Sequence, residues 1–146
     1  MKKTNKNINV YFWGGILITG IIAAAFYYYT KPPDLLAVPA TRETIQKGEQ
    51  IFNQHCIGCH GEKAVGENPS MRNGGKKAKG GLWAPALNGT AHAWHHKDRQ
   101  LFTTIKNGSL NSESPMRGFK DRLSDEEIVM VMHYFKNLWP MRIKIK

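Results

Sequence analysis

The chain has 146 residues, of which 21 are Lys or Arg and 11 are Asp or Glu, so it carries a formal charge of +10 and has room for one domain, or for one domain with an anchor. A hydrophobic content of 41% is enough for a packed core, which excludes a chain that is disordered throughout. The two cysteines are too few for the disulfide framework of a small secreted domain, so whatever they do is local.

The first predicted element is a membrane-spanning helix from Val10 to Tyr29. These twenty residues carry no charge, and a helix of this length spans roughly 30 Å, the thickness of the hydrocarbon core of a bilayer. Aromatic residues lie at both ends, where amphipathic rings favour the headgroup level. Lys2, Lys3 and Lys6 precede the run, so the positive-inside rule predicts a cytoplasmic N-terminus and export of the rest.

A cleaved signal peptide is the alternative interpretation of this segment. Its apolar stretch would run from Val10 to Ile22, and Ala23-Ala24-Ala25 would be the cleavage site. The run is longer than a signal peptide needs and ends in an aromatic belt, which favours a retained anchor. In both cases the head is exported, so we expect a single-pass protein of the cytoplasmic membrane with its head on the periplasmic side, a compartment that excludes nucleic acid as a partner.

The composition divides the chain into three parts. Residues 1–30 form the N-terminal cytoplasmic tip and the transmembrane anchor. Residues 31–39 should be an extended linker, because prolines at positions 32 and 33 end the helix. Residues 40–146 should form the soluble domain.

The soluble domain is predicted to be all-α, because no segment alternates convincingly as a strand. The first helix should cover Thr41 to Gln54, with Gly48 on its apolar face, where another helix can approach closely. A long loop at 62–82 is rich in glycine and lysine. A short helix, which Asp98 can cap, follows at Asp98 to Lys106. The last helix begins at a capping box, Ser124-Asp125-Glu126-Glu127, and repeats apolar residues on one face.

The two cysteines lie in the stretch His55-Cys56-Ile57-Gly58-Cys59-His60-Gly61. C-x-x-C-H is the signature for covalent attachment of haem c: each thiol adds to one haem vinyl group, and His60 presents an imidazole nitrogen to the iron. A redox dithiol would need a thioredoxin-like context, and a zinc site would need a second pair of ligands. The sequence shows neither, so we expect one haem c bound by Cys56 and Cys59, with His60 as the proximal iron ligand.

Residues on both sides of this motif resemble the class I cytochrome c family, from about Thr41 to Trp139. The similar stretches follow in the family's order: Gly48 and Phe52, the Cys56–Gly61 motif, Ala84-Pro85-Ala86-Leu87, Ile105-Lys106-Asn107-Gly108, Ser114-Pro115-Met116-Arg117-Gly118-Phe119, Leu123 to Ile128, and Tyr134. The resemblance implies the family's fold, in which the first and last helices cross near Gly48 and Tyr134 and loops wrap the haem. It also implies one-electron transfer as the activity.

The second, distal iron ligand is expected to be Met116. A thioether favours ferrous iron, so a methionine–histidine pair raises the reduction potential. Met116 lies on a loop between two helices and occupies the family's ligand position, although Arg117 stands where the family usually has proline. The other candidates are less suitable, because they lie on a helix, near the C-terminus or in the glycine-lysine loop: Met71, Met130, Met132 and Met141.

A small cluster of His92, Trp94, His95 and His96 offers alternatives. Bis-histidine ligation from this cluster would lower the potential, and imidazoles also suit copper or zinc. The simpler interpretation is a loop packed at the haem edge, in which Trp94 or a histidine binds a propionate.

Charge and anchor together indicate redox partners. Lysines gather at 76, 77 and 79, and Arg142, Lys144 and Lys146 form a basic tail. A positive surface would speed encounters with acidic redox partners or hold the head against anionic lipid. We therefore expect a membrane-tethered electron carrier that takes electrons from a quinol-oxidising complex or dehydrogenase and passes them to a terminal oxidase. The alternatives are a haem c subunit of a multi-subunit oxidoreductase and, with less support, an open-site haem enzyme or gas sensor.

Overall fold

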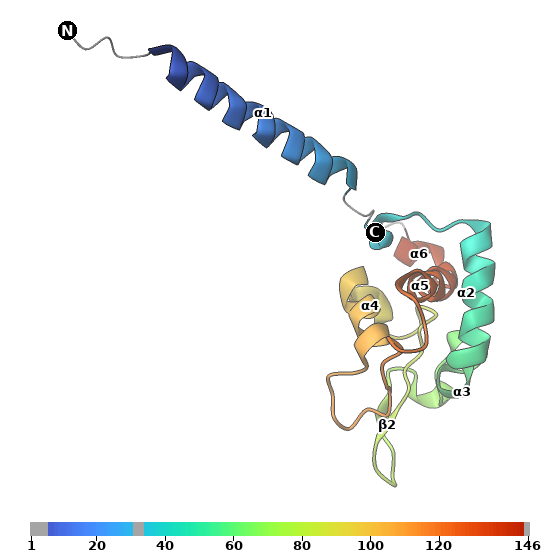
Figure 1. The fold of residues 1–146 in the computed structure, drawn as a ribbon. Coiled ribbons are helices and arrows are strands. Elements are labelled where there is room, and N and C mark those ends of the chain that lie inside the picture. Colours follow the sequence, from blue (N-terminus) through green and yellow to red (C-terminus); the bar gives the residue numbers. More distant parts are fainter. Residues whose placement is uncertain (1–5, 31–33, 145–146) are drawn as a thin grey trace. The chain divides into compact units, whose positions relative to one another are not determined.

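The computed structural model describes residues 6–30 and 34–144, and the chain forms two compact units, Met1–Asp34 and Leu35–Lys146. The first unit contains one described helix, α1 (Lys6–Thr30; Figure 1). Among the described residues, α1 is the one helix that length and composition would allow to cross a membrane, with a mean hydropathy of 1.3 over Trp13–Thr30. The lysines predicted to hold the N-terminus in the cytoplasm, Lys2 and Lys3, lie outside the described residues.

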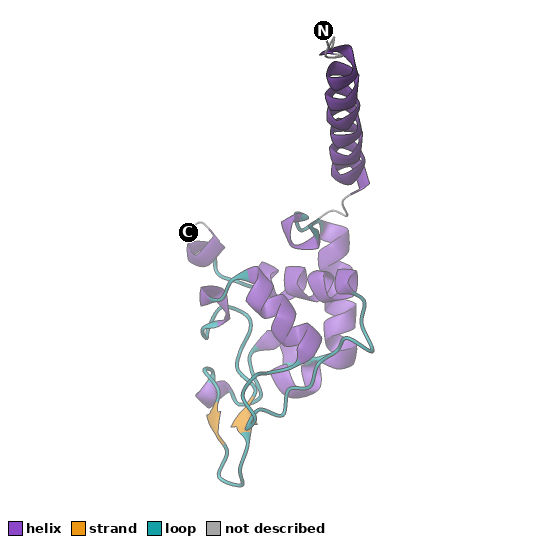
Figure 2. Ribbon diagram, turned by 60° about the vertical axis from the view of Figure 1, so that its left-hand side comes forward, coloured by secondary structure: helices purple, strands orange, loops and turns teal. Residues whose placement is uncertain are grey.

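The second unit, called the head below, is mostly helical, which confirms the all-α prediction (Figure 2). Its α-helices are α2 (Arg42–His55), α3 (Ile57–His60), α4 (Asp98–Asn107), α5 (Asp125–Asn137) and α6 (Met141–Lys144). Short 3₁₀ turns are η1 (Leu35–Ala37), η2 (Glu62–Ala64), η3 (Pro69–Met71) and η4 (Ala93–His95).

A small antiparallel ribbon, which overlaps the predicted loop 62–82, was not expected. Strand β1 (Gly75–Lys76) pairs with β2 (Leu82–Trp83), with Gly75 opposite Trp83. Each strand has two residues, too few for a visible alternation of apolar and polar side chains.

Side-chain caps fix the beginnings of the two long helices of the head. Thr41 caps α2, and its hydroxyl accepts from the Thr44 backbone N–H at 3.2 Å. Ser124 caps α5 in the predicted capping box: its hydroxyl accepts from the Glu127 N–H at 3.2 Å, while the Glu127 carboxylate accepts from the Ser124 N–H at 2.8 Å. Each box satisfies N–H groups that would otherwise lack partners.

The prediction that Asp98 caps α4 is wrong. Lys97 occupies the N-cap position without a side-chain bond, and Asp98 begins the helix proper. Its two carboxylate oxygens instead accept from Lys136 of α5, each at 2.7 Å. A charge-assisted contact with two oxygens is stronger than a single cap bond, and it ties α4 to α5.

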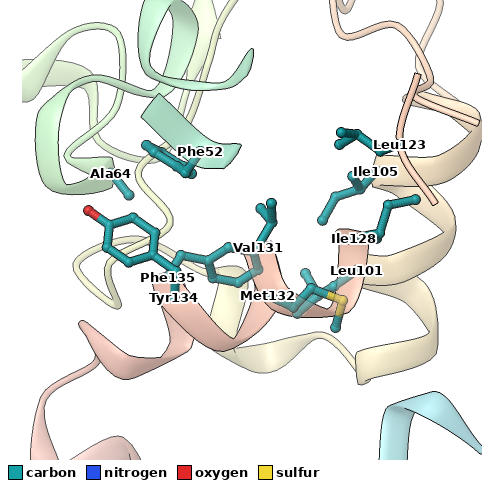
Figure 3. Close-up of a cluster of buried hydrophobic side chains, with 10 residues drawn as sticks. All are labelled: Phe52, Ala64, Leu101, Ile105, Leu123, Ile128, Val131, Met132, Tyr134 and Phe135. Carbon is teal, nitrogen blue, oxygen red and sulfur yellow. The ribbon is translucent and has the colours of Figure 1, made fainter. Parts of the chain in front are cut away.

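The core of the head lies where α2 crosses α5. Gly48 allows this approach, because a Cβ at that position would lie 1.9 Å from the Met130 carbonyl oxygen and 3.1 Å from the Tyr134 Cβ. The Phe52 and Tyr134 rings lie 5.2 Å apart, centre to centre. Figure 3 shows the buried cluster around them. Each fully buried large side chain in it, such as Phe52 or Phe135, contributes about 1.5–3 kcal/mol.

Residues 35–39 of the predicted linker belong to the head and pack on it. They contain η1, whose Leu36 lies against the core. The ring of His133 on α5 interacts with the Val38 backbone and shares a 3.0 Å hydrogen bond with the Thr44 hydroxyl of α2. Residues 35–40 are therefore held against α5 rather than free of it.

Candidate functional site

A cavity of about 550 Å³ lies in the head, within the roughly 300–1,000 Å³ range of small-molecule and cofactor sites. Its walls come from α2, α3, α4, α5 and two loops. All four predicted site residues line it: Cys56, Cys59, His60 and Met116. The sequence therefore brings to one cavity groups that lie up to sixty positions apart.

The short helix α3 presents the Cys-His motif to the cavity. The Cys56 N–H still bonds to the Phe52 carbonyl at the end of α2, and the His60 N–H bonds to the Cys56 carbonyl at 2.9 Å. Gly61 then ends α3 with φ +71°, a conformation that L-residues rarely adopt. A Cβ at Gly61 would lie 2.7 Å from the Gly66 carbonyl oxygen, so only glycine lets the chain turn here.

His60 is buried and oriented by one hydrogen bond. Its Nδ1 lies 2.9 Å from the Pro85 carbonyl oxygen, which has no proton to give, so Nδ1 must carry the proton and donate. Burial lowers the pKa of His60, and the bond to Pro85 and the charge of Glu67 oppose this shift. The ring is therefore neutral at pH 7, with the lone pair of Nε2 available as a metal ligand.

The segment 84–87, which supplies the Pro85 carbonyl, is fixed from several sides. The Leu87 N–H bonds to Ala64 and the Ala86 N–H to Arg72, each at 2.8 Å. A carboxylate oxygen of Glu67 accepts from the Ala84 N–H at 3.1 Å. At the far end of the segment, the Trp139 indole N–H donates to the Leu87 carbonyl at 2.7 Å.

Sequence reasoning missed the roles of Pro85, Glu67 and Trp139. Ala84-Pro85-Ala86-Leu87 belonged to the family pattern, which was the signal for Pro85. The sequence carries no comparable signal for Glu67 or Trp139, because each acts through backbone groups that every residue possesses.

The two cysteines have different surroundings. Cys56 is half-buried and Cys59 is exposed. Burial raises the pKa of the Cys56 thiol to about 11; the neighbouring Cys59 adds to this shift, and Arg122 opposes it. One sulfur thus lies in the wall of the cavity and the other at its rim.

The loop 108–118 holds Met116 at the cavity. Its ends meet closely, since a Cβ at Gly108 would lie 2.9 Å from the Gly118 nitrogen. The Met116 carbonyl accepts from the Ser109 N–H at 3.2 Å, and the Phe119 N–H bonds back to α4 at 3.0 Å. Met116 is half-buried and packs against the core. Arg117, which replaces the family's proline, is exposed at the rim.

The histidine cluster contributes two members to the same cavity, His92 and His96. Their rings lie 5.5 Å apart, whereas His95 stacks on Trp94 at 3.5 Å. Burial lowers the pKa of His92, and the neighbouring His96 and His95 lower it further. Among the described residues, no group of three or more His, Cys, Asp or Glu side chains could hold a metal ion by itself.

The residues of the cavity fit a covalently bound haem. Two thiols three positions apart and a neutral imidazole lie on its wall, and a thioether lies on a loop of the same cavity. Much of the remaining lining is apolar, including Phe52, Leu101, Ile105 and Val131. In the described part of the chain, every buried side-chain nitrogen or oxygen has a hydrogen-bond partner, so the pocket imposes no unpaired polar group on a large apolar ring.

Two of the three lysines at positions 76, 77 and 79 form ion pairs with glutamates. Lys76 pairs with Glu113 at 3.0 Å, and Lys77 pairs with Glu67 at 2.5 Å. The second contact lowers the pKa of Glu67. Arg117 and Arg122, in contrast, line the mouth of the cavity and form no ion pair with any residue that the structure describes.

The sequence matches known proteins over most of the head. The family model "Cytochrome C oxidase, cbb3-type, subunit III" matches residues 43–135, which include every predicted site residue. The chain is 31% identical over 99 residues to a "Cytochrome c6-like" protein from Nostoc sp. (strain PCC 7120), and the match covers 68% of this chain and 75% of the relative.

Two solved structures resemble the head more distantly. One is cytochrome cL from Methylophaga aminisulfidivorans, with 24% identity, 79% of this chain and 64% of the other covered, and a TM-score of 0.49. The other is the reducing HAO-like protein complex Kustc0457/Kustc0458 from Kuenenia stuttgartiensis, with 22% identity, coverage of 78% and 54%, and a TM-score of 0.53. Our chain thus covers less than two thirds of the matched chain in each of these two structures.

Proposed function

This chain belongs to the cytochrome c family of electron-transfer proteins, whose members bind covalently attached haem c, and on that premise we propose that it is a membrane-tethered mono-haem electron carrier. Haem c supplies the one-electron couple of its iron. The protein's own contribution is to hold the ligands, to bury the group and to set its potential.

The proposal gives each cavity residue one role. Cys56 and Cys59 form the thioether bonds, His60 is the proximal iron ligand, and Met116 is the distal ligand. With His60 and Met116 both binding the iron, no coordination site would be left for a substrate, so the chain would carry electrons instead of catalysing a reaction.

The observation that carries the proposal is the orientation of His60. A ring that donates from Nδ1 to the Pro85 carbonyl at 2.9 Å is fixed in the tautomer that leaves Nε2 free, and the bond raises the basicity of the ligand nitrogen. The position of Met116 on the wall of the same cavity supports a second ligand from a different loop.

The distal ligand can be tested by near-infrared absorption of the oxidised, haem-loaded protein. We expect a methionine–iron charge-transfer band in the parent protein and its loss in Met116→Ala. Met71→Ala is the matched control, because Met71 is exposed and its removal should leave the band unchanged. A band that persists in Met116→Ala would refute the assignment, because another methionine would then bind the iron. A parent protein without the band would also refute it and would favour a histidine ligand such as His92 or His96, which line the same cavity.

The membrane and the redox partners complete the proposal. Helix α1 would anchor the chain in the cytoplasmic membrane with the head on the periplasmic side, with residues 31–39 as the linker. The donor would be a quinol-oxidising complex or dehydrogenase, and the acceptor a terminal oxidase. Arg117 and Arg122 at the cavity mouth support a partner with an acidic surface, because opposite charges accelerate encounter.

A second candidate function is that of a haem c subunit permanently docked in a larger oxidoreductase. The description of the matching family model, which names a subunit of an oxidase, favours it. Purification in mild detergent separates the two candidates: a subunit remains with large partner chains, whereas a free carrier elutes alone.

A further inference from the structure

The short connection between α1 and the head limits how far the head can lie from the end of the membrane helix. Thr30 ends α1 and Leu35 begins η1, so five residue steps separate them, at most about 18 Å when fully extended. Two of the intervening residues are Pro32 and Pro33, which restrict the backbone further. If α1 spans the bilayer, η1 must therefore lie at or just beyond the lipid headgroups.

The contacts of η1 extend this limit on the distance from the end of α1 to a whole face of the head. Leu36 packs against the core, and the ring of His133 interacts with the Val38 backbone. Because η1 is attached to α5 in this way, the surface around it must stay close to the membrane as well.

Helix α6 lies on that same face. A groove of about 650 Å³ is lined by residues of both segments: Leu36, Val38, Pro39, Trp139, Ile143 and Lys144. Figures 1 and 2 place η1 and α6 together at one end of the head, whereas α3, with its Cys-His motif, lies toward the other end. We call the surface formed by residues 35–40 and 139–144 the α6–η1 face.

The α6–η1 face has the chemistry of a lipid-binding surface. Arg142 is exposed, and Lys144 donates to the neutral Asn137 carbonyl at 2.6 Å. Neither cation forms an ion pair with any described residue. The nearest acidic group on α4, Asp98, is already paired with Lys136. Exposed apolar side chains accompany the cations: Met141 is 70% exposed and Val38 42%.

We propose that the α6–η1 face rests on anionic phospholipid headgroups, with Arg142 and Lys144 binding lipid phosphates and Met141 entering the interface. The proposal rests on the anchoring of α1 that is part of the proposed function. Juxtamembrane cations next to a tether are attracted to anionic lipid, and apolar side chains add to the binding. The head is thereby held in one orientation, with the end that carries α3 and the exposed Cys59 directed away from the lipid and open to redox partners.

Amide hydrogen exchange of the full-length, haem-loaded protein in lipid nanodiscs tests this orientation. We expect amides of 139–144 and 35–40 to exchange several-fold more slowly in phosphatidylcholine–phosphatidylglycerol discs than in pure phosphatidylcholine discs. The protection should disappear in about 1 M salt, where the Debye length is about 3 Å, and in the double variant Arg142→Gln/Lys144→Gln.

The matched control removes two charges from the other end of the head. Arg72→Gln/Lys79→Gln replaces two exposed basic residues of the loop 62–82, and it should keep the lipid-dependent protection. Equal exchange of 139–144 in both kinds of disc, or protection that appears only when other membrane proteins are added, overturns the proposal. A chain that leaves neutral discs altogether refutes the anchor itself, so failure of the proposed function gives a different result from failure of the docking.

Discussion

Two aromatic N–H groups from distant parts of the sequence bind the same short segment. His60 donates to the Pro85 carbonyl and Trp139 to the Leu87 carbonyl, at 2.9 and 2.7 Å. The bond from Trp139 joins residues 52 positions apart. The orientation of the His60 imidazole therefore depends on a residue beyond the end of the last long helix.

Trp139→Phe tests this dependence. The variant keeps an aromatic ring beside Phe135 but loses the indole N–H, so the Leu87 carbonyl loses its donor. The loss of one such bond costs about 0.5–1.5 kcal/mol. We expect a lower free energy of unfolding in urea, by about 1 kcal/mol, and faster amide exchange at 87–90. Tyr134→Phe is the control, because the Tyr134 hydroxyl has no hydrogen bond to the part of the chain that the structure describes; equal losses in both variants would contradict the prediction.

At the residue scale, the sequence predicted the groups whose chemistry requires adjacent positions. The proposed thioether bonds and iron ligand would impose the spacing of Cys56, Cys59 and His60, so a local pattern is enough to predict them. Pro85 and Trp139 act across the fold through backbone carbonyls, and a carbonyl has no sequence signature. Such residues become visible only when the chain is folded.

At the scale of elements, one glycine determines how closely α2 and α5 pack. A Cβ at Gly48 would lie 1.9 Å from the Met130 carbonyl oxygen and 2.5 Å from its carbon. Both are backbone atoms, which cannot rotate out of the way as a flexible side chain could. The two helices would have to separate, and contacts such as that between Phe52 and Tyr134 would loosen.

We therefore expect Gly48→Ala to destabilise the head. The better helix propensity of alanine gains about 1 kcal/mol, whereas overpacking a core costs typically about 1–3 kcal/mol and sometimes more. With a backbone clash this close, the overpacking cost should exceed the gain. The denaturation midpoint of the haem-loaded protein measures the net effect. Gln50→Ala, an exposed change on the same helix, should shift it little, and an unchanged midpoint in Gly48→Ala would show that the helices accommodate the methyl group.

The contact between α5 and α2 also predicts a pH dependence. Burial lowers the pKa of His133, as does the nearby Lys136, while the Val38 backbone and Asp98 oppose the shift. Since the folded pKa lies below that of the unfolded chain, the unfolded state binds the proton first as the pH falls. Stability should therefore decline below the ordinary histidine pKa of about 6.5.

His133→Gln should flatten this acid-side decline, because glutamine cannot titrate. Urea unfolding between neutral and mildly acidic pH measures the effect as the difference between variant and parent protein, which removes the contributions of other groups. Thr44→Ser keeps both the titrating ring and a hydroxyl partner for it, so it should retain the parent's dependence. Parallel stability curves for His133→Gln and the parent would exclude this role of His133.

The elements that the sequence predicted are those that local signals define. The helices at 41–54 and from Ser124 have caps and an apolar face, and the structure has both. Helix α6 was expected only as a basic tail, because a four-residue helix is too short to be stable alone. In the structure Ile143 lies close to Gly89, a tertiary contact that no local pattern encodes. The same applies to Asp98, whose partner lies on α5.

At the scale of the whole molecule, the question is whether α1 remains attached to the head in the mature protein. The chain forms two compact units that divide at Asp34, and the part of α1 from Trp13 to Thr30 is apolar enough to cross a membrane. A signal peptide would leave the head free to diffuse, whereas an anchor confines its search for partners to the membrane surface and raises their effective concentration. The two possibilities differ in the covalent structure of the mature chain.

Intact-mass spectrometry of the haem-loaded protein from washed membranes decides between them. A retained anchor predicts the mass of the chain including α1 plus one haem, because a twenty-residue apolar run exceeds what a signal peptide needs. The double variant Ala23→Leu/Ala25→Leu would block cleavage at a small-residue site. If the parent chain is not cleaved, the masses of variant and parent should differ only by the two substitutions. A mature parent chain that lacks the first 25 residues, together with a full-length double variant, would show that α1 is a signal peptide, and membrane association would then have to come from the head alone.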